Sequence, residues 1–247
     1  MSDGARTAPG RAAPALEPFA GDVCVFAKPP VAGQVKTRLA RTLGQDVAAE
    51  LAAAFFADTW ALLRTLPWIR PVLATTQAGR PEGLACEADA EVWLQGEGGL
   101  GERLERVLRR ALERGPWAMA LGADTPGLPG PLLEEARAKL AAGADAVLGP
   151  AEDGGFYLLA LKRCPPGLLA EGLPWSSADT LERTRERLES HGLRTVLLEP
   201  WFDVDTEADL HRLADLLAKG AVRAPSTHDV LIRLGLVPTE ASGAEEA

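Results

Sequence analysis

The residues of this chain best suited to chemistry lie in one loop, which follows the apolar run 23–27. The loop contains Gly33 and the cations Lys28, Lys36 and Arg38. A strand that enters a glycine-containing loop and then a helix can surround a phosphate with backbone N–H groups. Three cations in a chain that is acidic overall therefore indicate an anionic ligand, most simply a nucleotide.

The loop matches neither of the two common phosphate-binding patterns. The P-loop pattern G-x-x-x-x-G-K-[ST] needs an earlier glycine that is missing here, and the dinucleotide fingerprint is absent as well. The alternative interpretation is a solvated, basic start of a helix. The helix macrodipole disfavours cations at its N-terminus, however, so Lys36 and Arg38 fit a bound phosphate better.

Carboxylates follow two other apolar runs, at the points where strands are expected to end. Asp124 follows the run 117–122, and Asp203 and Asp205 follow the run 194–198. Mg²⁺ takes one or two carboxylates together with substrate phosphates, so Asp124 could share a metal ion with either Asp203 or Asp205. Each also has a structural alternative, because Asp124 could cap a turn or a helix and Asp205 could be the N-cap of the next helix.

A further candidate is Asp153, which precedes Gly154 and Gly155 at the start of an aromatic strand. Paired glycines permit a ligand to approach the backbone closely, and Asp153 could orient an acceptor hydroxyl or act as a base. The alternative is a hairpin turn, for which Asp-Gly is the usual sequence. Trp175 and Ser176 could line an acceptor pocket, although tryptophan is more often a core residue.

Strand-like and helix-like runs alternate along the chain and position these candidates. We expect strands at 23–27, 71–76, 91–94, 117–122, 145–149, 156–161 and 194–198, and helices at 46–66, 100–112, 131–142, 179–190, 206–219 and 227–236. This alternation predicts an α/β fold with a mainly parallel central sheet and helices on both faces. Such sheets bind ligands at the carboxyl ends of their strands, where the candidate residues fall. The glycine-rich segment that begins at Gln95 forms either a mobile ligand loop or a linker.

The length, charge and composition of the chain favour some classes of protein over others. The 247 residues are long enough for a sizeable core, and we expect one domain over residues 21–236 with flexible tails at 1–20 and 237–247. A net charge of −9 argues against a general nucleic-acid binder. No apolar run approaches the ~20 residues that span a membrane, and the N-terminal stretch lacks the apolar region of a signal peptide. Three widely separated cysteines favour the cytoplasm.

The order of the motifs resembles the DUF2064 family of glycosyltransferase-A-like (GT-A) proteins, in the nucleotide-diphospho-sugar transferase superfamily. The resemblance covers about residues 22–219. The matching motifs are Ala27-Lys28-Pro29-Pro30, Gly33-x-Val35-Lys36-Thr37-Arg38-Leu39, Gln95-Gly96, Leu100-Gly101-Glu102-Arg103, Gly122-x-Asp124-x-Pro126, Gly149-Pro150, Asp153-Gly154-Gly155-Phe156-Tyr157-Leu158, Trp175-Ser176 and Asp203-Val204-Asp205-Thr206. The first loop is also similar to that of 2-phospholactate guanylyltransferases. In those enzymes a Thr-Asn pair comes directly after the Asp-Gly-Gly turn, whereas this chain has Phe156 and Tyr157 at that position.

The resemblance implies a single-domain, Rossmann-like GT-A fold that binds a nucleotide with a divalent metal, Mg²⁺ or Mn²⁺, held by Asp124 and Asp205. The implied nucleotide-binding residues are Ala27, Lys28, Gly33, Lys36, Thr37, Arg38, Gln95 and Asp124. The implied acceptor-binding residues are Asp153, Gly154, Gly155, Trp175 and Ser176. Asp153 and Asp124 are the expected catalytic residues.

Three functions fit these residues. The leading hypothesis is a cytoplasmic, metal-dependent glycosyltransferase that moves a sugar from a nucleotide-diphospho-sugar to a small-molecule acceptor. The alternative is a nucleotidyltransferase, which would use Lys28, Lys36 and Arg38 on the three phosphates of a nucleotide triphosphate and release pyrophosphate. The third is a non-catalytic nucleotide-binding protein, because a fold does not determine a function.

Overall fold

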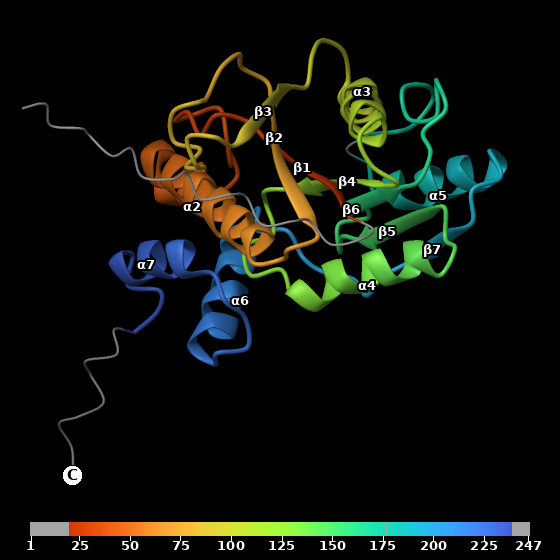
Figure 1. Ribbon diagram of the computed structural model, residues 1–247. Helices are drawn as coiled ribbons and strands as arrows, with labels where there is room; N and C mark the ends of the chain where they lie inside the picture. The colour runs from red at the N-terminus through yellow and green to blue at the C-terminus, as the bar shows by residue number, and fades with distance from the viewer. Residues whose placement is uncertain (1–19, 176, 239–247) are drawn as a thin grey trace, which may run out of the picture.

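A seven-stranded sheet forms the centre of the protein, and helices cover both of its faces (Figure 1). The computed structural model describes residues 20–175 and 177–238. The strands are β1 (Gly21–Ala27), β2 (Ile69–Thr75), β3 (Glu91–Leu94), β4 (Ala118–Gly122), β5 (Ala146–Pro150), β6 (Phe156–Leu161) and β7 (Thr195–Leu197). The helices are α1 (Ala40–Leu43), α2 (Gln45–Arg64), α3 (Leu100–Leu112), α4 (Gly130–Ala141), α5 (Thr180–Ser190), α6 (Glu207–Ala218) and α7 (Pro225–Arg233). The predicted α/β fold is confirmed, whereas the two expected tails lie almost entirely outside the described residues.

The strand order is β3-β2-β1-β4-β6-β5-β7. Strand β6 runs antiparallel to its neighbours β4 and β5, and the other pairs are parallel. The sheet is therefore mainly parallel, as predicted. The parallel strands share one direction, so the loops after β1, β4, β5 and β7 leave the sheet at the same edge.

Strand β1 shows why the apolar runs of the sequence become central strands. Val23 and Val25 belong to a core cluster on one face, together with residues of α2 and α4. Cys24 belongs to the cluster on the other face, with residues of α3 and the buried Leu188 of α5. A strand covered by helices on both faces has no solvated side, which explains its continuous apolar sequence.

A third cluster lies beside the sheet and contains Leu39, Phe202 and Val204, packed with residues of α2, α6 and α7. Leu39 ends the cationic loop, and Val204 lies between two of the candidate carboxylates. This cluster therefore fixes two segments of the candidate site that are far apart in sequence. Asp58 on α2 joins the same region by accepting hydrogen bonds from the first residues of α7.

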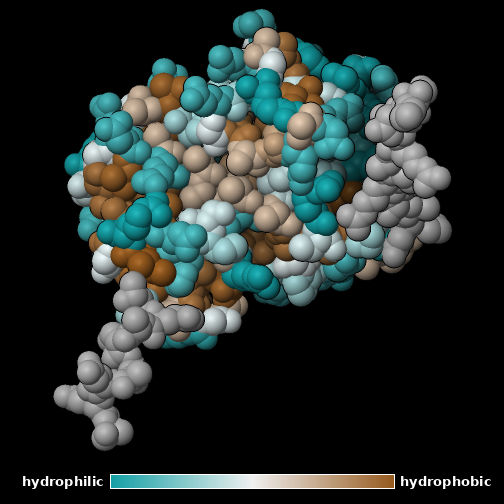
Figure 2. Space-filling model, turned by 60° about the vertical axis from the view of Figure 1, so that its left-hand side comes forward, coloured by the Kyte–Doolittle hydropathy of each residue, from teal (hydrophilic) through white to brown (hydrophobic). Residues whose placement is uncertain are grey.

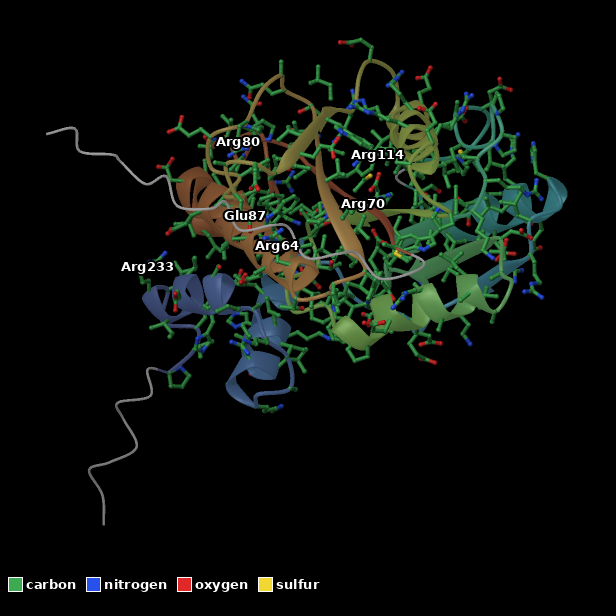
Figure 3. The ribbon with its side chains drawn as sticks, viewed as in Figure 1. Arg64, Arg70, Arg80, Glu87, Arg114 and Arg233 are labelled. Atoms are coloured by element: carbon green, nitrogen blue, oxygen red, sulfur yellow. The ribbon has the colours of Figure 1, made fainter. Side chains whose placement is uncertain are left out.

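The amino end of β1 holds a buried charge, Asp22. Arg70 on β2 donates to its Oδ1 atom at 2.6 Å, and the Nε atom of Arg114 lies 3.5 Å from Oδ2. Figure 3 shows Arg70 and Arg114 close together in this part of the molecule. Burial raises the pKa of the Asp22 carboxyl, and Arg70 and Arg114 oppose that rise.

The surface carries both hydrophilic and apolar residues. Figure 2 shows hydrophilic residues spread over one face, around an area of weakly hydrophobic residues near its middle. No helix in the described part of the chain has the length and hydrophobicity needed to cross a bilayer.

Candidate functional site

The side chains of Lys36, Asp124 and Asp205 meet at the carboxyl edge of the sheet. The Lys36 ammonium lies 2.7 Å from Oδ1 of Asp124 and 2.9 Å from Oδ1 of Asp205. The Lys36 side chain is only 4% exposed, whereas those of Asp124 and Asp205 are 57% and 43% exposed. One buried cation is thus shared by two carboxylates that face solvent.

The loop after β1 aims Lys36 at these carboxylates. Gly33 and Lys36 both have positive φ, 78° and 44°, and Lys36 is the non-glycine residue with this conformation in the described chain. The loop ends at Leu39, which is fully buried in the third cluster. A left-handed backbone at Lys36 therefore turns its side chain inward while Leu39 anchors the end of the loop.

A short helix follows this loop directly and precedes the helix that the sequence predicts at 46–66. Helix α1 starts at Ala40 and has only four residues, and α2 follows from Gln45. The Lys36 carbonyl accepts a hydrogen bond from the Ala40 N–H at 2.9 Å, so Lys36 lies at the start of the helical segment, and its ammonium contacts two carboxylates. Arg38, Thr37 and Lys28 lie on the same loop, and the two cations among them are exposed.

Asp124 lies in the turn between β4 and α4. Its backbone carbonyl accepts a hydrogen bond from the Val204 N–H at 2.9 Å, which joins the Asp124 turn to the segment that carries Asp205. The residue before α4 is Pro129, so Asp124 does not cap that helix. Its side chain instead pairs with Lys36.

The alternative interpretation of Asp205 as a helix N-cap was wrong. Thr206 is the N-cap of α6, and its hydroxyl accepts from the Asp209 N–H. Asp209 in turn accepts from the Thr206 N–H at 2.8 Å, which completes a capping box. The Asp205 side chain remains available to Lys36.

Asp203, which the sequence offered as an alternative to Asp205 for the metal ion, also lies close to this site. Burial and the nearby carboxylates of Asp124 and Asp153 raise the pKa of Asp203 to about 7, and Lys36 opposes that rise. Burial would lower the pKa of Lys36, but Asp124 and Asp205 raise it above its ordinary value. The site therefore concentrates negative charge that a single ammonium does not neutralise.

Asp153 lies in the turn that joins β5 to β6. Its Oδ1 atom accepts from the Gly155 N–H at 2.9 Å, and the Gly154 N–H donates to the Ala151 carbonyl. The hairpin-turn interpretation of Asp-Gly is thus confirmed. Gly154 has a φ of 91° and packs directly against the backbone of Ala178, so this position needs glycine for structural reasons. Asp153 still lies near enough to Asp203 to raise its pKa.

Trp175 is half-buried and lies edge-on to Phe156, with 6.1 Å between ring centroids. It also lies against Gly101 at the start of α3, where a Cβ added to the glycine would lie 2.6 Å from the indole Nε1 atom. Trp175 therefore packs against the helix that follows the glycine-rich segment. Ser176, the other residue expected there, lies outside the described residues.

Gln95 lies at the end of β3 and is buried. Its side-chain amide donates to the Ala74 carbonyl at 2.9 Å, so this N–H already has a structural partner. Arg106 on α3 donates to the backbone carbonyls of Gln95 and Glu97 and holds the glycine-rich segment against its own helix. Ala27, the last residue of β1, is buried beside Thr75 of β2.

The chemistry of the donor set fits a divalent cation. Two carboxylate oxygens, from Asp124 and Asp205, already contact one cationic nitrogen, and the Asp203 carboxyl lies close by. Mg²⁺ needs only one or two carboxylates when substrate phosphates complete its coordination. The described residues contain no group of three or more His, Cys, Asp or Glu side chains arranged as a metal site on their own.

Sequence and structure comparisons support the fold. The profile of the family described as "Uncharacterized protein conserved in bacteria (DUF2064)" matches residues 59–177, which confirms the resemblance. This match includes Asp124 but neither Lys36 nor Asp205. A search of curated protein sequences gives no significant match.

Among solved structures, the chain is similar to a candidate nucleotide-diphospho-sugar transferase from Desulfovibrio desulfuricans G20. The TM-score is 0.78 at 28% identity, and the match covers 87% of this chain and 95% of that chain. It is also similar to CMP:2-keto-3-deoxy-manno-octonic acid synthetase complexed with CTP, with a TM-score of 0.53, 14% identity and coverage of 81% and 99%. For the bifunctional IspDF from Campylobacter jejuni the TM-score is 0.50 at 10% identity, with coverage of 77% and 53%. The last two similarities show the fold alone.

Proposed function

Starting from the DUF2064 resemblance and the GT-A-like fold, we propose that this protein is a metal-dependent transferase that uses a nucleotide-activated donor. The observation that carries the proposal is the convergence of Lys36, Asp124 and Asp205 at the carboxyl edge of the sheet. Ligands of open α/β sheets bind at that edge. The name of the similar Desulfovibrio protein favours a nucleotide-diphospho-sugar as the donor.

In this proposal the cationic loop binds the diphosphate. Lys28 and Arg38 are exposed and have no ion pair among the described residues, so both can reach a ligand without breaking a contact. Asp124 and Asp205 would hold Mg²⁺ or Mn²⁺. When bound, the metal would neutralise the negative charge that develops on the departing phosphate.

Asp153 is the proposed residue for the acceptor. Its Oδ1 atom is held by the Gly155 N–H, which fixes the carboxylate at the turn and leaves Oδ2 to receive a proton. In glycosyl transfer, the acceptor oxygen forms a bond to the anomeric carbon and gives its proton to Asp153. The bond from that carbon to the phosphate oxygen breaks, and the nucleotide diphosphate leaves with the electron pair. Trp175 would lie beside the acceptor.

The second candidate is nucleotidyl transfer, which the three cations of the loop favour. Lys28, Lys36 and Arg38 match the charge of a triphosphate better than that of a diphosphate. The acceptor would then attack the α-phosphate, and pyrophosphate would leave. The cytoplasm remains the proposed location in either case.

Product analysis tests both candidates. The protein is incubated with a panel of nucleotide sugars or nucleotide triphosphates, each with Mg²⁺ or Mn²⁺ and a panel of small acceptors. Free nucleotide diphosphate from a nucleotide sugar supports glycosyl transfer, and pyrophosphate from a triphosphate supports nucleotidyl transfer. The proposed function is refuted if neither product forms with any substrate and no nucleotide raises the melting temperature.

The site assignment is tested by Asp205→Asn, which removes the charge but keeps the shape. We expect kcat/KM to fall at least ~100-fold, about 2.7 kcal/mol of transition-state stabilisation. Asp215→Asn on the exposed side of α6 is the matched control and should stay within about twofold of wild type. Equal activity of the two variants would show that Asp205 does not serve the reaction.

A further inference from the structure

Lys36 lies where a metal ion would be expected to bind. Its ammonium contacts the same two oxygen atoms, Oδ1 of Asp124 and Oδ1 of Asp205, that the proposed function assigns to the metal. The contacts of 2.7 and 2.9 Å are ordinary for an ammonium and a carboxylate. Mg²⁺ binds oxygen at about 2.0–2.1 Å, so the two cations cannot occupy this position together.

The Lys36 side chain is held in this position from several directions. It is 4% exposed, and its ammonium lies 5.5 Å from the centroid of the Phe55 ring on α2. The backbone at Lys36 is left-handed, a conformation that residues other than glycine rarely adopt. The fold thus directs the side chain onto the carboxylates.

The charge around Lys36 favours an exchange of cations. The carboxylates of Asp124 and Asp205 share one ammonium, so the cluster keeps a net negative charge. A divalent cation would neutralise this charge more fully. A displaced Lys36 would then need a new anionic partner, and a nucleotide diphosphate on the same loop would supply one.

We propose that Lys36 is an internal counter-cation of the metal site, which a divalent metal displaces and which then binds the phosphates of the nucleotide. This inference rests on the proposed function and adds a coupling to it. Metal binding alone must displace Lys36 from its carboxylates. A nucleotide offsets that cost, so metal and nucleotide should each strengthen the binding of the other by the same factor.

Mn²⁺ binding, measured by electron paramagnetic resonance of the free ion, tests the proposal without reference to activity. For wild type we expect weak binding of Mn²⁺ alone and at least ~10-fold tighter binding with a nucleoside diphosphate from a panel of four bases. Lys36→Met removes the competing ammonium. It should bind Mn²⁺ alone at least ~10-fold more tightly than wild type and lose most of the gain from the nucleotide.

Two further variants separate competition from a general effect of charge. Lys28→Met removes a cation from the same loop that does not contact the carboxylates, and its affinity for Mn²⁺ alone should stay within about threefold of wild type. Lys36→Arg keeps the charge and should keep Mn²⁺ binding weak. Lys36→Gln replaces Lys36→Met if that variant does not give a cooperative thermal transition.

The outcomes distinguish this inference from the proposed function. If wild type and Lys36→Met bind Mn²⁺ with equal affinity, Lys36 does not compete with the metal and only the counter-cation role is overturned. If neither protein binds Mn²⁺ even with a nucleoside diphosphate, the metal site itself is wrong and the metal dependence of the proposed function falls with it. An equal gain in affinity for Lys28→Met and Lys36→Met also contradicts the inference, since any lost positive charge would then suffice.

Discussion

Replacing Asp58 with alanine should destabilise the protein strongly, because this carboxylate caps a helix distant in sequence. Asp58 lies on α2 and accepts from the Ser226 N–H at 2.8 Å, the Thr227 N–H at 2.8 Å and the Thr227 hydroxyl at 2.6 Å. The residue at the N-cap of α7 is Ala224, which has no side-chain group to satisfy these donors. Asp58 takes over that role and also places a negative charge at the positive end of the helix dipole.

The expected loss follows from these contacts. Asp58 is 6% exposed and Thr227 is fully buried, so water cannot easily replace the lost acceptor. Hydrogen bonds to a charged group contribute about 1.5–3 kcal/mol, and a buried donor without a partner costs about 1–3 kcal/mol. We estimate that Asp58→Ala lowers the free energy of unfolding by about 3–5 kcal/mol. For a domain of this size that corresponds to a fall in melting temperature of roughly 6–20 °C.

Urea unfolding followed by circular dichroism measures this loss. Asp46→Ala is the matched control, since Asp46 is exposed in the first turn of the same helix; it should cost no more than about 1 kcal/mol. Asp58→Asn keeps one acceptor oxygen but replaces the other with an NH₂ donor that faces the N–H groups of α7. The free energy of unfolding of this variant should therefore lie between those of wild type and Asp58→Ala. A loss below about 1 kcal/mol for Asp58→Ala would refute the idea that Asp58 secures α7.

Two further predictions concern the packing of α3 and the buried charge on β1. Gly101→Ala should lower the free energy of unfolding, because the added Cβ would lie 2.0 Å from the Leu169 carbonyl oxygen and 2.6 Å from the indole Nε1 atom of Trp175. Gly99→Ala, where the nearest atom would lie 3.8 Å away, is the control, and equal stability of the two variants in urea unfolding would contradict the packing argument. Asp22→Asn tests the buried charge. The pKa of Asp22 is raised in the folded protein, so ionisation of this carboxyl disfavours the folded state. The free energy of unfolding of wild type, relative to that of the variant, should therefore fall as pH rises from about 4 through the raised pKa. Urea unfolding at several pH values measures this difference, and a rise with pH would mean that the ion pair with Arg70 outweighs the burial of Asp22.

The sequence predicted the elements of the fold well, because their signals are local. Strand β1 is covered on both faces and reads as an unbroken apolar run, and Asp153-Gly154 forms the hairpin turn that this dipeptide usually forms. The Thr206–Asp209 capping box was also visible as a pattern of two residues three apart. The sequence also allowed Asp205 as the N-cap, and the structure assigns that role to Thr206.

Contacts between distant segments could not be predicted in the same way. Lys36 and Asp205 are 169 positions apart, and their pairing depends on a left-handed backbone at Lys36 that no glycine or asparagine signals. The raised pKa of Asp203 depends on Asp124 and Asp153, which reach it only through the order of strands in the sheet. Charge composition could indicate an anionic partner for Lys36, but not which anion.

Lys36 contacts carboxylates in the structure, whereas the sequence led us to expect that it binds phosphate. The burial of its ammonium explains how both can hold. A buried ammonium needs a compensating anion at every stage, because an unpaired charge in this position would be strongly unfavourable. Asp124 and Asp205 supply that anion, and a phosphate can do so only if another cation then satisfies both carboxylates. Because its ammonium is buried, Lys36 cannot move freely to a phosphate. Its release from Asp124 and Asp205 therefore depends on a metal ion. A phosphate-binding lysine on an exposed loop, such as Lys28, would carry no such dependence.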